Sequence, residues 1–238
     1  MWSELRRLRE GIDYGTPPRD GEAVTLTVDG VEVTVPEGSS VMLAAAVAGR
    51  AIPKLCATDS LEAFGSCRVC LVEIEEMRGY PASCTTLVRS GMVVQTQSDN
   101  LAKLRKGVME LYLSDFPAAE IPSGWSKFHR TLEEIGVEKH RYGEGQVHFD
   151  LPVDDSNPYF LFDPAKCIVC SRCVRACEEV QGTFALTIQG RGFESKVAAS
   201  QDQPFMESEC VSCGACVQAC PSHALVEKSL FSGGYDRA

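Results

Sequence analysis

The first regular pattern in the chain begins at Ala23, where apolar and polar residues alternate on both sides of Asp29-Gly30. The apolar positions are Val24, Leu26, Val28, Val31, Val33 and Val35. This pattern predicts a β-hairpin with a two-residue turn. The Ala-rich run Val41–Ala48 follows Ser39-Ser40 and precedes Gly49. It predicts a helix with a serine cap at its start.

Three further patterns predict elements in the N-terminal half. Leu71–Ile74 and Met92–Thr96 are short apolar runs that predict strands. Asp99–Asp115 predicts a helix, because apolar residues recur in it at helical spacing. Those residues are Leu101, Leu104, Val108, Leu111 and Tyr112.

The C-terminal half begins with a stretch without cysteine that runs to Asp163. Its proline and glycine residues predict loops, with one short helix at Thr131–Ile135. Beyond it the pattern predicts two strands and a turn. These are a strand through Phe184, Leu186 and Ile188, a turn at Gly190-Arg191-Gly192, and a strand at Ala224–Glu227.

Composition and charge narrow the possible functions. The 238 residues are 44% hydrophobic and carry a net charge of −10, which argues against nucleic acid as a partner. Residues 1–10 are charged and do not form a secretory signal, and no run approaches 18 apolar residues. We therefore expect no membrane span. Because the twelve cysteines fall into metal-ligand spacings, we expect a reducing compartment, the cytoplasm.

Eight of the twelve cysteines form two copies of the spacing C-x2-C-x2-C-x3-C. The copies run from Cys167 to Cys177 and from Cys210 to Cys220, and the second ends in Cys-Pro. This spacing indicates two four-iron clusters, as in bacterial two-cluster ferredoxins. Structural zinc and disulfides are the alternatives, but zinc usually takes two C-x2-C pairs rather than triplets with a remote fourth cysteine.

In such ferredoxins the fourth cysteine of each run ligates the other cluster. We expect it to lie on the first turn of a helix and to point across. The first cubane set is therefore predicted to be Cys167, Cys170, Cys173 and Cys220. The second cubane set is predicted to be Cys177, Cys210, Cys213 and Cys216.

The four remaining cysteines have the spacing C-x10-C-x2-C-x13-C and predict a two-iron cluster. They are Cys56, Cys67, Cys70 and Cys84. Gly65 in the loop before Cys67 allows the backbone to approach sulfide closely. A zinc site is the alternative, since C-x2-C by itself does not select the metal. His129, His140 and His148 lack cysteine partners nearby in sequence, which favours surface or hydrogen-bonded histidines over ligands.

The hairpin, helix and two-iron loop resemble the start of a β-grasp ferredoxin. The resemblance implies an α+β fold, in which a β-grasp (plant-type) [2Fe-2S] ferredoxin domain precedes a bacterial-type two-[4Fe-4S] ferredoxin domain. The expected divisions are an arm at 1–20, the two-iron domain at 21–98, a connector at 99–160, the four-iron domain at 161–228 and a tail at 229–238. The arm is expected to begin with a short polar helix, and it either lies on a partner or is a loosely ordered terminus.

The order of these sites resembles NADH-quinone oxidoreductase large subunits, iron hydrogenases and the diaphorases of NAD-reducing hydrogenases. The runs from Arg172 to Gly182 and from Cys210 to Pro221, with the turn at Gly190-Arg191-Gly192-Phe193, resemble NAD-linked formate dehydrogenases that contain molybdenum or tungsten. This likeness implies an electron-transfer subunit with one [2Fe-2S] and two [4Fe-4S] clusters and no catalytic residue of its own. Its expected partners are a metal–pterin catalytic subunit and a flavin/NAD subunit, in a hetero-oligomer.

The chain departs from this family at one cluster. The family has a further cubane, held by one His and three Cys, after the two-iron domain. Here Phe116 stands at the expected His position, and no cysteine lies between Cys84 and Cys167. Two other functions stay open: the iron–sulfur subunit of an NAD-coupled nickel–iron hydrogenase, and a free ferredoxin-like carrier.

Overall fold

The computed structural model describes residues 13–117, 126–143, 145 and 148–229. The chain divides into two compact units, Met1–Gly107 and Val108–Ala238, and the division falls inside helix α3 (Asp99–Ser114). Each unit has its own hydrophobic core. The five finer divisions expected from the sequence stay a prediction.

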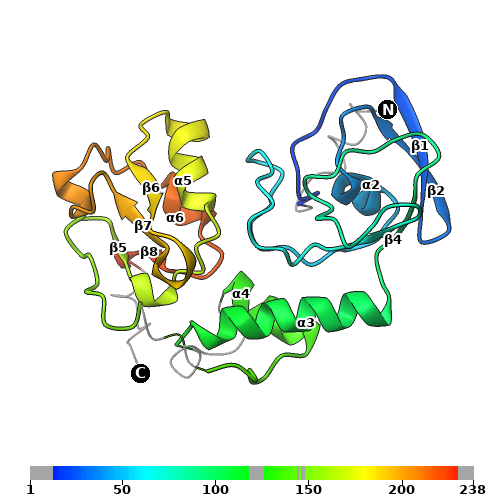
Figure 1. Cartoon of the computed structure of the whole chain (residues 1–238). Coiled ribbons are helices and arrows are strands. Elements are labelled where there is room, and N and C mark those ends of the chain that lie inside the picture. Colours follow the sequence, from blue (N-terminus) through cyan, green and yellow to red (C-terminus); the bar gives the residue numbers. More distant parts are fainter. Residues whose placement is uncertain (1–12, 118–125, 144, 146–147, 230–238) are drawn as a thin grey trace. The chain divides into compact units, whose positions relative to one another are not determined.

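Unit 1 is built on the predicted hairpin (Figure 1). Strands β1 (Ala23–Val28) and β2 (Val31–Pro36) are antiparallel, with Val28 opposite Val31. Asp29 and Gly30 have φ values of 47° and 78°. Two left-handed residues in a two-residue loop match the right-handed twist of the strands, which is why Asp-Gly is favoured there.

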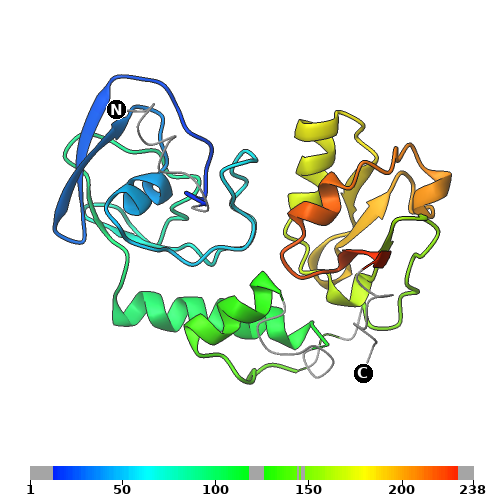
Figure 2. The same cartoon turned by 180° about the vertical axis from the view of Figure 1, so that it is seen from behind.

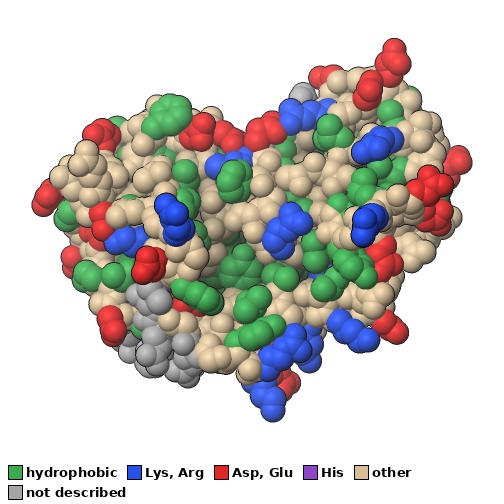
Figure 3. Space-filling view, viewed as in Figure 1, with side chains coloured by type: hydrophobic (Ala, Val, Ile, Leu, Met, Phe, Trp, Pro, Cys, Tyr) green, Lys and Arg blue, Asp and Glu red, His purple; other side chains and the backbone are tan. Residues whose placement is uncertain are grey.

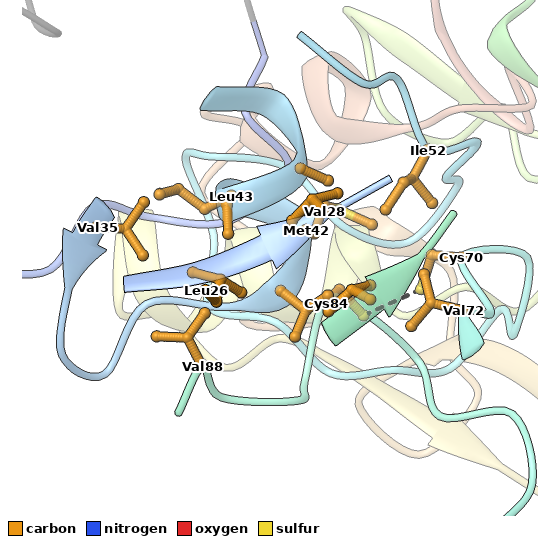
Figure 4. Close-up of a cluster of buried hydrophobic side chains, with 14 of the residues drawn as sticks. Leu26, Val28, Val35, Met42, Leu43, Ile52, Cys70, Val72, Cys84 and Val88 are labelled. Carbon is orange, nitrogen blue, oxygen red and sulfur yellow. Dashed lines mark hydrogen bonds between the residues drawn. The ribbon is translucent and has the colours of Figure 1, made fainter. Parts of the chain in front are cut away.

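Two short strands complete the sheet of unit 1 in the order β2-β1-β4-β3. Strand β4 (Val93–Gln95) is parallel to β1, and β3 (Glu73–Ile74) is antiparallel to β4. Helix α2 (Val41–Val47) packs on this sheet, with Leu43, Leu26 and Val28 in the shared core (Figure 4). The β-grasp prediction is confirmed, although β3 and β4 are shorter than the apolar runs that predicted them.

The described part of the N-terminal arm packs on its own unit. Tyr14 is buried, Lys54 pairs with Asp13, and the Thr16 hydroxyl lies 2.7 Å from the Ser40 hydroxyl at the start of α2. This part of the arm is therefore not a free extension. The polar helix expected at the start of the chain lies outside the described residues, as does nearly all of the tail.

Helix α3 was predicted correctly in extent, but its buried face was not. Leu104 and Leu111 are 37% and 46% exposed. The residues buried along α3 are Leu101, as predicted, together with Arg105, Met109, Glu110, Leu113 and Ser114. Arg105 faces inward, and its guanidinium donates to the carbonyls of Leu71 and Thr96 at 2.6 and 2.9 Å.

Unit 2 contains short elements joined by long loops (Figures 1 and 2). Its strands form two antiparallel pairs, β5 with β8 and β6 with β7. The strands are β5 (Phe160–Phe162), β6 (Leu186–Gln189), β7 (Lys196–Ala199) and β8 (Leu225–Glu227). The helices are α4 (Lys127–Ile135), α5 (Arg172–Arg175) with its π-helical continuation η3 (Ala176–Gln181), and α6 (Ala215–Ala219). Single 3-10 turns are η2 (Pro164–Lys166), η4 (Gly192–Glu194) and η5 (Phe205–Glu207).

Three sequence-based expectations for unit 2 need correction. Strands β5 and β7 were not predicted. Phe184 lies outside β6, because its φ of 55° is left-handed and its side chain is 67% exposed. Helix α4 begins four residues earlier than expected, since the Ser126 hydroxyl caps it by accepting from the His129 N–H.

Within the part of the chain that the structure describes, no helix is both long and apolar enough to cross a bilayer. On the face shown in Figure 3, basic and acidic side chains are interspersed.

Candidate metal centres

The structure brings together the four cysteines predicted to bind the two-iron cluster. Cys56, Cys67, Cys70 and Cys84 are each at most 2% exposed. The Cys70 and Cys84 sulfurs lie 3.5 Å apart (Figure 4). The Cys67 N–H donates to the Cys56 sulfur at 3.4 Å, and the Cys56 N–H donates to the Cys67 sulfur at 3.5 Å.

Crowding shifts the pKa values of these thiols in opposite directions. The pKa of Cys56 is lowered to about 2, because the Cys67 and Cys84 thiols hydrogen-bond to its sulfur. The pKa of Cys67 is raised, first by its hydrogen bond with Cys56 and then by burial. The protein alone thus stabilises few negative charges in this buried group. Cationic iron would remove this limit, so the thiols fit a cluster.

Two loop features support this group of thiols. Gly65 has a φ of 73°, and a side chain there would meet the Thr85 methyl group at 3.1 Å. Arg105, which the sequence reading did not single out, anchors the Leu71 carbonyl directly after Cys70. A charged residue within a predicted helix gives little sign of such a role, so only the structure reveals it.

The two cubane runs have the same backbone conformation at matching positions. Val169 and Ser171 flank Cys170 with φ values of 49° and 64°. Ser212 and Gly214 flank Cys213 with φ values of 57° and 77°. Left-handed valine is uncommon and costs energy, so its presence marks a loop held in shape by something else.

The thiols of the first cubane set are buried and influence one another electrostatically. Burial raises the pKa of Cys167 to about 12 and also raises the pKa values of Cys170 and Cys173. The Cys220 sulfur adds to the shift of all three, because a charge on it disfavours a charge on its neighbours. Cys220 therefore lies near the triplet of the other run, as the crossed pairing predicts. Ligation itself stays a prediction.

The second cubane set lines one cavity, together with apolar residues of unit 2. Its four cysteines are Cys177, Cys210, Cys213 and Cys216. Burial raises the pKa of Cys216 to about 12, and the neighbouring cysteines of the set add to this shift. Cys213 is exposed, so this set reaches the surface of unit 2.

The helical position expected for the fourth cysteines was wrong. Cys177 lies in η3, within a helical run that starts at Arg172, and Cys220 directly follows the last residue of α6. Cys177 thus lies in the middle of a continuous helical run, whereas Cys220 lies just beyond the end of a short helix.

Among the described residues, no three His, Cys, Asp or Glu side chains are arranged around a single metal ion. Clusters do not need such a trio, because a two-iron cluster takes two thiolates per iron and a cubane takes one. Backbone N–H groups also point at sulfur, as clusters require for charge stabilisation. Leu225 N–H donates to Cys220 at 3.5 Å, and Ser212 N–H donates to Cys210 at 3.4 Å.

Phe116, at the position where the family resemblance implies a histidine ligand, belongs to an aromatic cluster. It is 3% exposed, and its ring centroid lies 4.6 Å from that of Phe128 and 5.4 Å from that of His129. His129 hydrogen-bonds Ser126, His140 hydrogen-bonds the Tyr142 carbonyl, and His148 lies 3.3 Å from an Asp115 oxygen. All twelve cysteines belong to the other three sets, so Phe116 fills this position by packing.

Comparison with known families supports a two-iron site in unit 1 and four-iron sites in unit 2. A 2Fe-2S iron-sulfur cluster binding domain matches residues 21–99, and a 4Fe-4S dicluster domain matches residues 166–224. The chain is 39% identical over 211 residues to an NADH-quinone oxidoreductase subunit of Mycobacterium tuberculosis. It is 37% identical over 214 residues to an NADP-reducing hydrogenase subunit of Solidesulfovibrio fructosivorans. The chain is an iron–sulfur module related to these oxidoreductase subunits.

The match to each relative covers 86% of this module but only 26% and 36% of the relatives, so the module spans about a quarter to a third of their length. It also resembles a chain in a crystal structure of NAD+-reducing [NiFe]-hydrogenase in the H2-reduced state. That match has a TM-score of 0.76 and 28% identity, and it covers 87% of this chain and 88% of the other.

Proposed function

We propose that this chain relays single electrons through one two-iron and two four-iron clusters within an NAD(P)-linked oxidoreductase complex. The observation that carries the proposal is the grouping of cysteines: sulfur contacts link the cysteines of the predicted two-iron set, and the four of the predicted second cubane set line one cavity. The set in unit 1 is buried in the unit that contains the four-stranded sheet. The second cubane set includes an exposed cysteine, through which electrons can leave or enter.

The chain's own residues hold and tune these centres. Thiolates ligate the irons, backbone N–H groups stabilise negative charge on sulfur, and burial excludes water. When bound, the clusters supply one-electron transfer. NADH gives up two electrons, so a flavin on a partner chain has to separate the pair.

For the substrate we propose formate, with a metal–pterin catalytic subunit and a flavin/NAD subunit as partners in the cytoplasm. The support is the likeness of the two cubane runs and the glycine turn to NAD-linked formate dehydrogenases. A second candidate is the diaphorase of an NAD-coupled nickel–iron hydrogenase. It is supported by the match that covers 88% of a chain in the NAD+-reducing hydrogenase structure.

Purification of the affinity-tagged chain from its own host, without oxygen, tests both the proposed cluster relay and the proposed substrate. We expect about ten irons per copy of this chain when it is analysed alone, from two plus four plus four. A value near fourteen would reveal a third cubane and contradict the ligand assignment. The isolated chain should accept electrons from dithionite but reduce no dye with formate or NADH.

The complex that co-purifies should then be assayed with formate, hydrogen and NADH as separate electron donors. Formate-driven dye reduction supports the first candidate, and hydrogen-driven reduction supports the second. Formate oxidation by the isolated chain, without flavin or molybdenum, would contradict the relay proposal.

A further inference from the structure

A buried asparagine lies beside the second cubane set. Asn157, just before β5, is 1% exposed. The Tyr159 N–H donates to its Oδ1 at 3.0 Å. Its Nδ2 lies 2.8 Å from the Ser212 hydroxyl oxygen and 4.0 Å from the Met206 sulfur. The side-chain amide therefore has a partner at each end.

These contacts fix the direction of every hydrogen bond in the group. A backbone N–H can only donate, so the atom that faces Tyr159 has to be the amide oxygen of Asn157. The amide nitrogen then faces Ser212, and it can only donate. The Ser212 oxygen must accept this hydrogen bond, which leaves its own hydrogen available for another acceptor.

The Cys210 sulfur is an acceptor in contact with the same residue, Ser212. Ser212 has a φ of 57°, and this left-handed conformation directs its N–H to the sulfur at 3.4 Å. Burial raises the pKa of Cys210, and interactions with the Ser212 backbone and side chain act in the opposite direction. The Ser212 N–H thus stabilises negative charge on this thiolate, and the hydroxyl, which has a hydrogen to donate, can supply a second donor.

We propose that Asn157 is a positioning residue that directs the Ser212 hydroxyl to the Cys210 sulfur and so raises the reduction potential of the cluster in the second cubane set. Reduction adds an electron to the cluster and increases the negative charge on its thiolates. A donated hydrogen bond stabilises the reduced form more than the oxidised form. The inference rests on the proposed ligation of a cluster by Cys210.

The first run shows that the loop does not need this hydroxyl. Val169 occupies the position that matches Ser212, with a similar φ of 49° and no hydroxyl. The hydrogen bond is therefore a local addition to the second set. The same comparison shows that a β-branched side chain fits this backbone conformation, which makes threonine and valine a matched pair of substitutions for Ser212.

The segment around Asn157 is also anchored without it. The Phe205 N–H donates to an Asp154 oxygen at 2.8 Å, and the Met206 N–H donates to the Ser156 hydroxyl at 3.2 Å. Loss of the Asn157 amide should leave the segment in place. Ser156→Ala removes one of these anchors without removing a donor to sulfur, so it serves as the control for general loosening.

The test is a redox titration of the full reconstituted chain, followed by electron paramagnetic resonance. Ser212→Val should lower the equilibrium constant for reduction of one cubane about tenfold, which is about 59 mV for a one-electron couple. Ser212→Thr should keep the original potential. Asn157→Asp should lower the potential at least as far as Ser212→Val, because its carboxylate accepts the Ser212 hydrogen and adds a negative charge. Ser156→Ala should have no effect.

Pulsed electron paramagnetic resonance after exchange into D2O provides a second measurement, because it detects exchangeable deuterons near the cluster. A deuteron near this cluster should be present in the parent chain and in Ser212→Thr, and absent in Ser212→Val. Equal potentials for Ser212→Thr and Ser212→Val would overturn the inference, as would a shift in Ser156→Ala equal to that in Asn157→Asp. If the parent chain assembles no cluster at Cys210, the proposed ligation fails as well, and iron analysis separates that result from the others.

Discussion

The two units hold their cysteines in different ways. In unit 1 a four-stranded sheet and helix α2 build a core that consists mainly of Leu, Val and Ala side chains and includes two of the four cysteines, Cys70 and Cys84. In unit 2 six of the eight cysteines belong to the main core cluster or pack against it. The cysteines thus make up a small part of the core in unit 1 and a much larger part of the core in unit 2.

Unit 2 also has shorter and less extensively paired secondary structure than unit 1. Unit 2 pairs its strands only two at a time, and α5 and α6 have four and five residues. Two-stranded sheets and helices of this length are barely stable alone in water. Unit 2 should therefore depend on its metal for folding, whereas unit 1 should retain its sheet without metal.

The largest expected effect is that of removing iron. After anaerobic chelation of the full chain, amide protons of β5, β6, β7 and β8 should lose nearly all protection from hydrogen exchange. Those of β1, β2 and α2 should keep most of theirs. Mass spectrometry of peptides from the exchanged chain measures both regions in one sample. Equal protection of both regions in the metal-free chain would refute the contrast.

A smaller effect separates the two cubane sets. Cys177→Ser should damage the cluster held by Cys210, Cys213 and Cys216, although Cys177 is nearer in sequence to the other triplet. Cys220→Ser should damage the cluster of the first run. Electron paramagnetic resonance spectra of the two variants show which cluster each cysteine ligates. Loss of the first-run cluster in Cys177→Ser would show that the crossed pairing is wrong.

In unit 1 the most direct test is a substitution of Arg105, which connects α3 to the carbonyls of Leu71 and Thr96 by hydrogen bonds. Arg105→Met should lower the free energy of unfolding of unit 1 by about 2 to 4 kcal/mol, because two buried carbonyls lose a charged donor. Hydrogen exchange of β1 and β4 in the full chain measures this change. Lys106→Met, on an exposed neighbour in the same helix, is the control and should change little.

The sequence was most informative where spacing is set by chemistry or by a period. The cysteine runs predicted the three groups, and alternation around Asp29-Gly30 predicted the hairpin. It was least informative where one long-range contact decides the outcome. Arg105 is buried against loop carbonyls of unit 1, and Asn157 reaches Ser212 across 55 residues. Neither contact has a local signature, because the partner groups are backbone carbonyls and a loop hydroxyl.

Strands β5 and β7 were missed for a related reason. Each has three or four residues and pairs with a strand distant in sequence or across a glycine turn. Runs such as Phe160–Phe162 are too short to show a period, so pairing rather than propensity decides them. Phe184 was assigned to β6 because the alternation extends to it, but its backbone is left-handed and the strand begins only at Leu186.

The smallest expected effect concerns the strain at Val169. A β-branched residue with a φ of 49° costs roughly 1 to 3 kcal/mol, and asparagine adopts this conformation more readily. If clusters hold this loop in shape, Val169→Asn should stabilise unit 2 by about 1 kcal/mol and raise the guanidinium concentration at which its cubanes bleach. Val180→Asn, at an exposed position in η3, provides the control and should give no gain. A lower bleaching midpoint in Val169→Asn would mean that the valine side chain contributes more by packing than its backbone strain costs.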